Sequence, residues 1–114
     1  MTQRSKRLGI LAGIYLLTLS SGPQAWSADA KSGKTTYDKL CASCHGPDGK
    51  GNPAMIKALG EKGLNIVRKE TKAKKDDELV KIIVEGAGKM PASGKGLSLQ
   101  EQKDVLTYTR SLAK

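Results

Sequence analysis

Both cysteines and the only histidine of this 114-residue chain lie in one stretch of five positions, CASCH, residues 41–45. The order C-x-x-C-H is the attachment signature of a covalently bound haem. Residues three apart on a helix share a face, so the thiols of Cys41 and Cys44 can each add to one vinyl group of the same haem. His45 then lies beside the iron and can bind it through a ring nitrogen.

Three other uses of two cysteines fit this sequence less well. A disulfide is the default in an exported chain, but a bridge between near neighbours closes a tiny loop and restrains the unfolded chain little. A redox-active C-x-x-C of the thioredoxin type begins a helix in a βαβ unit, and no strand pattern occurs here. A structural zinc site takes four ligands, whereas this motif offers three.

The N-terminal segment has the layout of a secretory signal peptide, with three basic residues before the apolar run 8–19. This run is shorter than the roughly 20 residues that span a bilayer, so an uncleaved anchor is the less favoured alternative. Small residues place the cleavage after Ala30 or after Ser27. We therefore expect a signal peptide over residues 1–30, a domain over residues 31–114, and a periplasmic protein without stable membrane insertion after cleavage.

The expected mature domain has little material for a hydrophobic core. The chain contains no phenylalanine, and Tyr37 and Tyr108 are the only aromatic residues after position 30. A domain of this size usually needs a disulfide, a metal or a cofactor to be stable. We therefore expect the haem itself to fill part of the interior.

Apolar spacing and helix caps predict an all-α fold of three to four helices around one haem. We expect residues 69–75, which are rich in lysine, to form a solvated loop. The expected helices are a first one from Ser32 through both cysteines, a short one over residues 52–60, a third from Asp76 or Asp77 to Gly86, and a last one opened by a capping box of Ser98 and Glu101.

The second axial position of the iron needs another ligand, because the chain has one histidine. Met90 is favoured, since it precedes Pro91 in a glycine-rich loop and lies 45 residues after His45, far enough to reach the opposite face. Met55, water and a lysine are the alternatives, and Met55 suits core packing on its short helix. Histidine–methionine ligation raises the potential and leaves no place for substrate, which indicates a one-electron carrier and not an enzyme.

At these residues the chain resembles the class I c-type cytochromes, the small monohaem proteins of bacterial periplasms. Three segments carry the resemblance in order: residues 33–51 with GKTTY and CASCHGPDGKG, residues 78–92 with ELVKIIVEGAGKMPA, and residues 105–112 with VLTYTRSL. The resemblance implies thioethers at Cys41 and Cys44, and an iron held by His45 and Met90.

The same resemblance implies details of packing. The first and last helices should cross, with Gly33 allowing close approach and Tyr37 packing near Tyr108. The Pro53 carbonyl should accept a hydrogen bond from the His45 ring, with Pro47 as a rival acceptor. The chain departs from larger members of the family in lacking an aromatic residue at Ser93 or Gly94. The partners of the haem propionates are therefore open, with Lys89, Lys95 or backbone amides as candidates.

Residues 31–114 keep 17 basic and 10 acidic residues, a formal net charge of +7, which favours redox proteins with acidic docking surfaces as partners. Nucleic acid is a poor partner, since the protein carries an export signal and no basic motif interleaved with aromatic residues. The leading function is a soluble, monomeric electron carrier. The alternatives are a dedicated cytochrome subunit of a periplasmic dehydrogenase and an open-site protein that handles gas or peroxide, although a base histidine for peroxide chemistry is absent.

Overall fold

The computed structural model describes residues 27–113, so most of the predicted signal peptide lies outside the described residues. Six helices follow one another along this part of the chain: α1 (Ala30–Leu40), α2 (Ala42–His45), α3 (Pro53–Leu59), α4 (Lys69–Ala73), α5 (Asp76–Glu85) and α6 (Leu99–Leu112). No strand occurs among the described residues. The all-α prediction is confirmed, but the predicted first helix is divided into α1 and α2, and α4 is a short helix beyond the predicted set.

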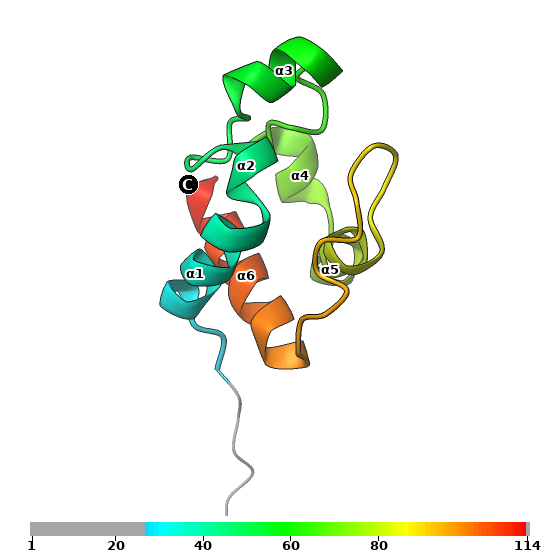
Figure 1. Ribbon diagram of the computed structural model, residues 1–114. Coiled ribbons are helices and arrows are strands. Elements are labelled where there is room, and N and C mark those ends of the chain that lie inside the picture. Colours follow the sequence, from blue (N-terminus) through cyan, green and yellow to red (C-terminus); the bar gives the residue numbers. More distant parts are fainter. Residues whose placement is uncertain (1–26, 114) are drawn as a thin grey trace, which may run out of the picture.

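The crossing of α1 and α6 is the most closely packed part of the fold (Figure 1). A Cβ atom at Gly33 would collide with the carbonyl oxygen of Asp104, so only glycine permits this approach. Four residues along α1, the Tyr37 ring meets the Tyr108 ring edge-on, with centroids 5.2 Å apart. The predicted crossing, the role of Gly33 and the tyrosine pair are confirmed.

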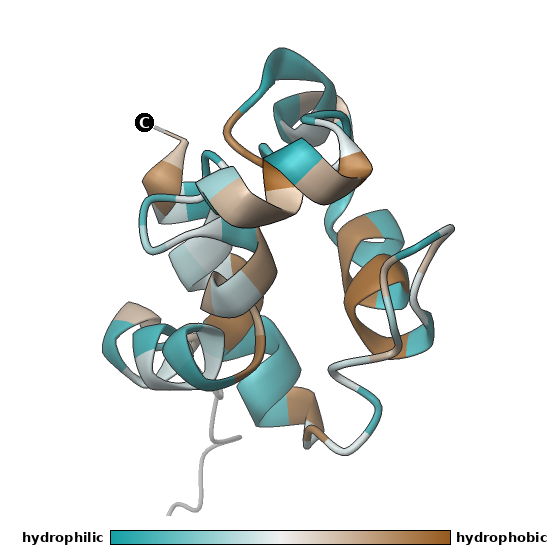
Figure 2. Cartoon of the chain, turned by 45° about the horizontal axis from the view of Figure 1, so that its top comes forward, coloured by the Kyte–Doolittle hydropathy of each residue, from teal (hydrophilic) through white to brown (hydrophobic). Residues whose placement is uncertain are grey.

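Opposite this crossing, α5 and the loop after it form the other side of the molecule, and α4 lies beside them (Figure 1). Figure 2 shows the apolar stripe of α5 turned toward the middle of the molecule, where apolar residues of α6 also gather. The buried hydrophobic residues are few: Tyr37, Leu64, Leu79, Val105 and Leu106. The described part of the chain therefore has the small core that its composition predicts.

Helix α1 begins at a different cap from the predicted one. Asp29, not Ser32, is the N-cap, and its carboxylate accepts hydrogen bonds from the Lys31 amide at 2.9 Å and the Ser32 hydroxyl at 2.8 Å. The Asp29 amide in turn donates to the buried carboxylate of Asp104 on α6, at 2.8 Å. Ser32 was the wrong choice because this contact between distant segments starts the helix earlier.

Residues 69–75 differ from the predicted loop, since α4 occupies their first five positions. The Arg110 guanidinium on α6 donates to the Lys74 carbonyl at 2.8 Å and to the Asp76 carboxylate at 2.7 Å, which ties the end of α4 and the start of α5 to α6. The remaining helices form as predicted. Asn52 caps α3, α5 opens at Asp76, and the capping box of Ser98 and Glu101 opens α6.

Candidate haem site

The C-x-x-C-H motif lies at a break between two helices. α1 ends at Leu40, Cys41 has φ −119° and ψ −36°, and α2 continues from Ala42 to His45. The break replaces the single predicted helix, but the amides of Cys44 and His45 still donate to the Cys41 carbonyl, at 3.2 and 3.0 Å. One turn of helix therefore holds both thiols and the imidazole in fixed relation.

The imidazole of His45 is buried, with 8% of the residue exposed. Its Nδ1 atom lies 2.8 Å from the Leu64 carbonyl oxygen. A carbonyl only accepts, so Nδ1 carries the proton and donates it, and Nε2 keeps its lone pair for a metal. The main chain thus sets both the tautomer and the direction of the ring.

The predicted acceptor of this hydrogen bond, Pro53, is wrong. Pro53 is the first residue of α3, where its carbonyl points along the helix axis toward the amides of the next turn. The segment around Leu64 instead returns beside the haem motif, because the Ile66 amide donates to the Gly49 carbonyl at 2.8 Å. This brings the Leu64 carbonyl within reach of the ring.

Two adjoining cavities of about 250 and 540 Å³ open beside the motif. Both are lined by His45, Gly63, Ala87 and Met90. Cys41 lines the smaller cavity and Cys44 the larger one, and the imidazole of His45 borders both. The smaller cavity is walled mainly by apolar side chains from α5 and α6: Leu79, Ile82, Ile83 and Leu106.

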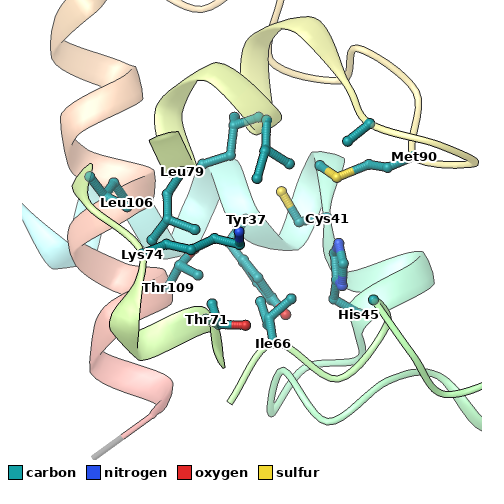
Figure 3. Close-up of a pocket in the computed structure, with 14 residues that line it drawn as sticks. Tyr37, Cys41, His45, Ile66, Thr71, Lys74, Leu79, Met90, Leu106 and Thr109 are labelled. Carbon is teal, nitrogen blue, oxygen red and sulfur yellow. The ribbon is translucent and has the colours of Figure 1, made fainter. Parts of the chain in front are cut away.

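Met90 reaches this space from the loop after α5. The loop turns back on itself through two hydrogen bonds between Ala87 and Met90, of 2.9 and 3.1 Å. Figure 3 shows the Met90 side chain and the His45 ring on the same side of the cavity as the Cys41 sulfur. Met55 on α3 lines neither cavity.

The cysteines are free thiols in this structure. Burial, and to a lesser degree the neighbouring Cys44, raise the pKa of the Cys41 thiol to about 11. Redox-active C-x-x-C motifs depend on a thiolate with a lowered pKa, which is the opposite shift. The environment of Cys41 therefore does not favour a redox-active disulfide exchange.

These residues fit a covalently bound haem. An apolar space accepts a flat apolar ring, two thiols from one helical turn can reach its two vinyl groups, and a nitrogen and a sulfur donor are available for the iron. Among residues 27–113, no group of three or more His, Cys, Asp or Glu side chains is placed to hold a metal ion directly. In the same range, no helix is long and apolar enough to cross a membrane.

Charged side chains are unevenly distributed around the two cavities. Lys62 and Lys89 line the larger cavity, whereas Lys74 lines the smaller one. Lys95, a predicted candidate for the propionates, lines neither. Leu64 and Lys74 are among the site residues that the sequence did not indicate, since a backbone acceptor and one lysine among many carry no pattern.

Comparison with known proteins gives three matches. Residues 28–108 match a family described as "Cytochrome C oxidase, cbb3-type, subunit III". The chain is 35% identical over 102 residues to "Cbb3-type cytochrome c oxidase subunit CcoP" of Azospirillum brasilense, covering 86% of this chain and 33% of that protein. It is 32% identical over 92 residues to "Cytochrome c6" of Rippkaea orientalis, covering 80% and 78%. The chain thus spans a third of the first relative and most of the second.

Proposed function

Since the chain belongs to the class I c-type cytochromes and carries haem c, we propose that it is a soluble periplasmic one-electron carrier with His45 and Met90 as axial ligands. Haem c supplies an iron that exchanges one electron between the ferric and ferrous states. Cys41 and Cys44 anchor the ring through thioethers, and the chain around them controls what reaches the iron.

The observation that carries this proposal is the shared lining of both cavities by His45 and Met90. The two residues are far apart in sequence, and the helical turn of the motif and the loop after α5 bring them to one space. Leu64 keeps the imidazole in one orientation, because its carbonyl accepts from Nδ1 at 2.8 Å. A Met90 thioether bound to the iron would leave no place for water or substrate, which suits electron transfer and not catalysis.

The surface near the iron site supports a transient encounter with other redox proteins. Lys62 and Lys89 line the larger cavity, and residues 31–114 have a formal net charge of +7. Positive charge around the site would steer the protein toward acidic docking surfaces, and the effect should weaken as salt rises. We place this encounter in the periplasm because of the predicted signal peptide, and we expect the carrier to be monomeric.

A second candidate function is a dedicated cytochrome subunit of a larger redox enzyme. The similarity to a subunit of a cbb3-type oxidase favours it. A dedicated subunit would bury one face permanently, with a larger and more apolar interface than a carrier needs. Gel filtration of the protein from its native host distinguishes the two, since a carrier elutes alone and a subunit elutes with its enzyme.

The visible spectrum of the haem-loaded protein tests the proposed ligands. We expect a low-spin spectrum with a weak red band from methionine-to-ferric-iron charge transfer, and no reaction with carbon monoxide. Met90→Ala should abolish the band and open the ferrous iron to carbon monoxide, whereas the control Met55→Ala should change neither. A wild-type protein that is high-spin and binds carbon monoxide would instead indicate an open site and remove the carrier proposal.

A further inference from the structure

The smaller cavity has one charged side chain among apolar walls. Besides the motif residues, the groups that line it are mostly aliphatic, and Lys74 is the only Lys, Arg, Asp or Glu among them. Thr71, one turn earlier, lines the same wall. Figure 3 shows Cys41, His45 and Met90 on one side of the cavity, with Lys74, Thr71 and Thr109 on the other.

The main chain at Lys74 is held in place from α6. The Arg110 guanidinium donates to the Lys74 carbonyl at 2.8 Å. The same guanidinium forms an ion pair of 2.6 Å with Asp76, so the nearest carboxylate along the chain is engaged with Arg110. Within residues 27–113, the ion pairs of the structure leave Lys74 without a carboxylate partner. The main chain at Lys74 is therefore positioned, and its exposed side chain has no ion-pair partner among the described residues.

Lys74 is exposed overall, but it lines an apolar cavity in which no carboxylate of the described residues neutralises its charge. Haem carries its two propionates on the edge opposite the two vinyl groups. When Cys41 and Cys44 hold the vinyl edge, the propionate edge faces away from the motif, toward the wall that carries Lys74 and Thr71. The charge and the position of Lys74 therefore both match a carboxylate.

We propose that Lys74 binds one haem propionate and that the Thr71 hydroxyl donates a hydrogen bond to the same carboxylate. This inference rests on the proposed attachment of haem at Cys41 and Cys44. It replaces the predicted candidates Lys89 and Lys95, of which Lys89 lines only the larger cavity and Lys95 neither.

Among residues 27–113, no other titratable group of the smaller cavity competes for this role. The Tyr37 hydroxyl donates to the Gly46 carbonyl at 2.7 Å, and burial raises its pKa, so it remains neutral. The thiols of the motif are used for attachment, and His45 is used for the iron. The ammonium of Lys74 is the remaining group of this cavity that can stabilise the ionised form of the propionate.

The test compares haem-loaded Lys74→Gln with Lys75→Gln, a matched control. Lys75 is the next residue, is exposed, loses the same charge on substitution and does not line the cavity. The readout is proton NMR of the haem propionate methylene groups in a titration from about pH 4 to about pH 9. Lys74→Gln should lower the acid dissociation constant of one propionate at least about tenfold, because an adjacent opposite charge is lost.

Lys75→Gln should titrate as the wild type does, and Lys74→Arg should restore most of the wild-type titration. An unchanged propionate in Lys74→Gln, or equal changes in the Lys74 and Lys75 variants, would overturn the proposal. In the wild-type protein, a nuclear Overhauser effect should connect the Lys74 ε-methylene with a propionate methylene. The absence of this effect would also overturn the proposal. Haem staining on a denaturing gel checks attachment separately, so failure of the attachment and failure of the Lys74 contact are distinguishable.

Discussion

The crossing of α1 and α6 and the facing side formed by α5 and its loop are built in different ways. At the crossing, Tyr37 and Val105 are fully buried by protein alone, and Gly33 brings the two backbones into contact. On the facing side, α5 packs much less extensively on α6 and turns its apolar stripe to a cavity. The comparison teaches that this small chain closes one side of its core with side chains and leaves a cavity of the size and lining that suit haem on the other.

The largest expected effect comes from removing the haem attachment. Cys41→Ala combined with Cys44→Ala should give a chain whose haem extracts in acid solvent and which is largely unfolded without it, since the ring that fills the cavity beside α5 is then missing. Circular dichroism and haem staining measure both results. Ser43→Ala, between the two cysteines, is the control and should keep haem and helix content. A well-folded haem-free protein would contradict the division of the core described above.

The second-largest effect is expected at the crossing of α1 and α6, where the core is closed by side chains. Gly33→Ala should destabilise the haem-loaded protein by about 3 kcal/mol, because a Cβ forces α1 away from the Asp104 carbonyl. Chemical denaturation measures the free energy of unfolding. Gly96→Ala is the matched control, since no atom lies within 4 Å of a Cβ at that position. Equal stability of the two variants would show that the crossing is not as close as the structure has it.

A smaller effect concerns the hydrogen bond between the crossing and the haem motif. Tyr37→Phe removes the donor to the buried Gly46 carbonyl and should cost about 1–3 kcal/mol of the free energy of unfolding. Tyr108→Phe is the control, since the structure gives its hydroxyl no such hydrogen bond within residues 27–113. The account would be weakened if both variants lost the same stability.

The smallest effect lies at the start of α1. The Ser32 hydroxyl first, and then the Lys31 amide, lower the pKa of Asp29 from its ordinary value of 3.8. The cap therefore stabilises the fold above that value, and its contribution is lost as the pH falls through the lowered pKa. Thermal unfolding should show a small loss in Asp29→Ala near neutral pH, and a smaller difference from wild type in acid.

The same variant bears on signal cleavage. Cleavage after Ser27 retains Asp29, whereas cleavage after Ala30 removes it together with its bonds to Asp104. If the exported protein has the mass of a chain that starts at Lys31, and Asp29→Ala does not change its thermal stability, cleavage occurs after Ala30. If it has the mass of a chain that starts at Ala28, cleavage occurs after Ser27.

Local signals in the sequence predicted much of the fold and the site. The capping box of Ser98 and Glu101, the cap at Asn52 and the spacing of the motif each involve residues within one helical turn, so pattern alone is informative. Gly33 and the tyrosine pair followed from the family resemblance, which carries information on long-range packing.

Features that depend on distant contacts or on the backbone were missed. The Asp29 cap is supported by Asp104, 75 residues away, and α4 is held by Arg110 on α6. The acceptor for the His45 ring is the Leu64 carbonyl, and every residue has a carbonyl, so no residue type marks it. Lys74 is one of 20 basic residues, and only the cavity distinguishes it from the others.

The most direct test of the account is the position of the methionine methyl resonances in the ferrous, haem-loaded protein. Met55 and Met90 are the two methionines after the predicted signal peptide. If Met90 closes the haem side of the core as an axial ligand, its methyl lies over the ring, and one resonance should be shifted far upfield by the ring current. Met90→Leu should remove it, and Met55→Leu should leave it. Two methyl resonances at ordinary positions, or an upfield resonance that disappears with Met55, would contradict the account.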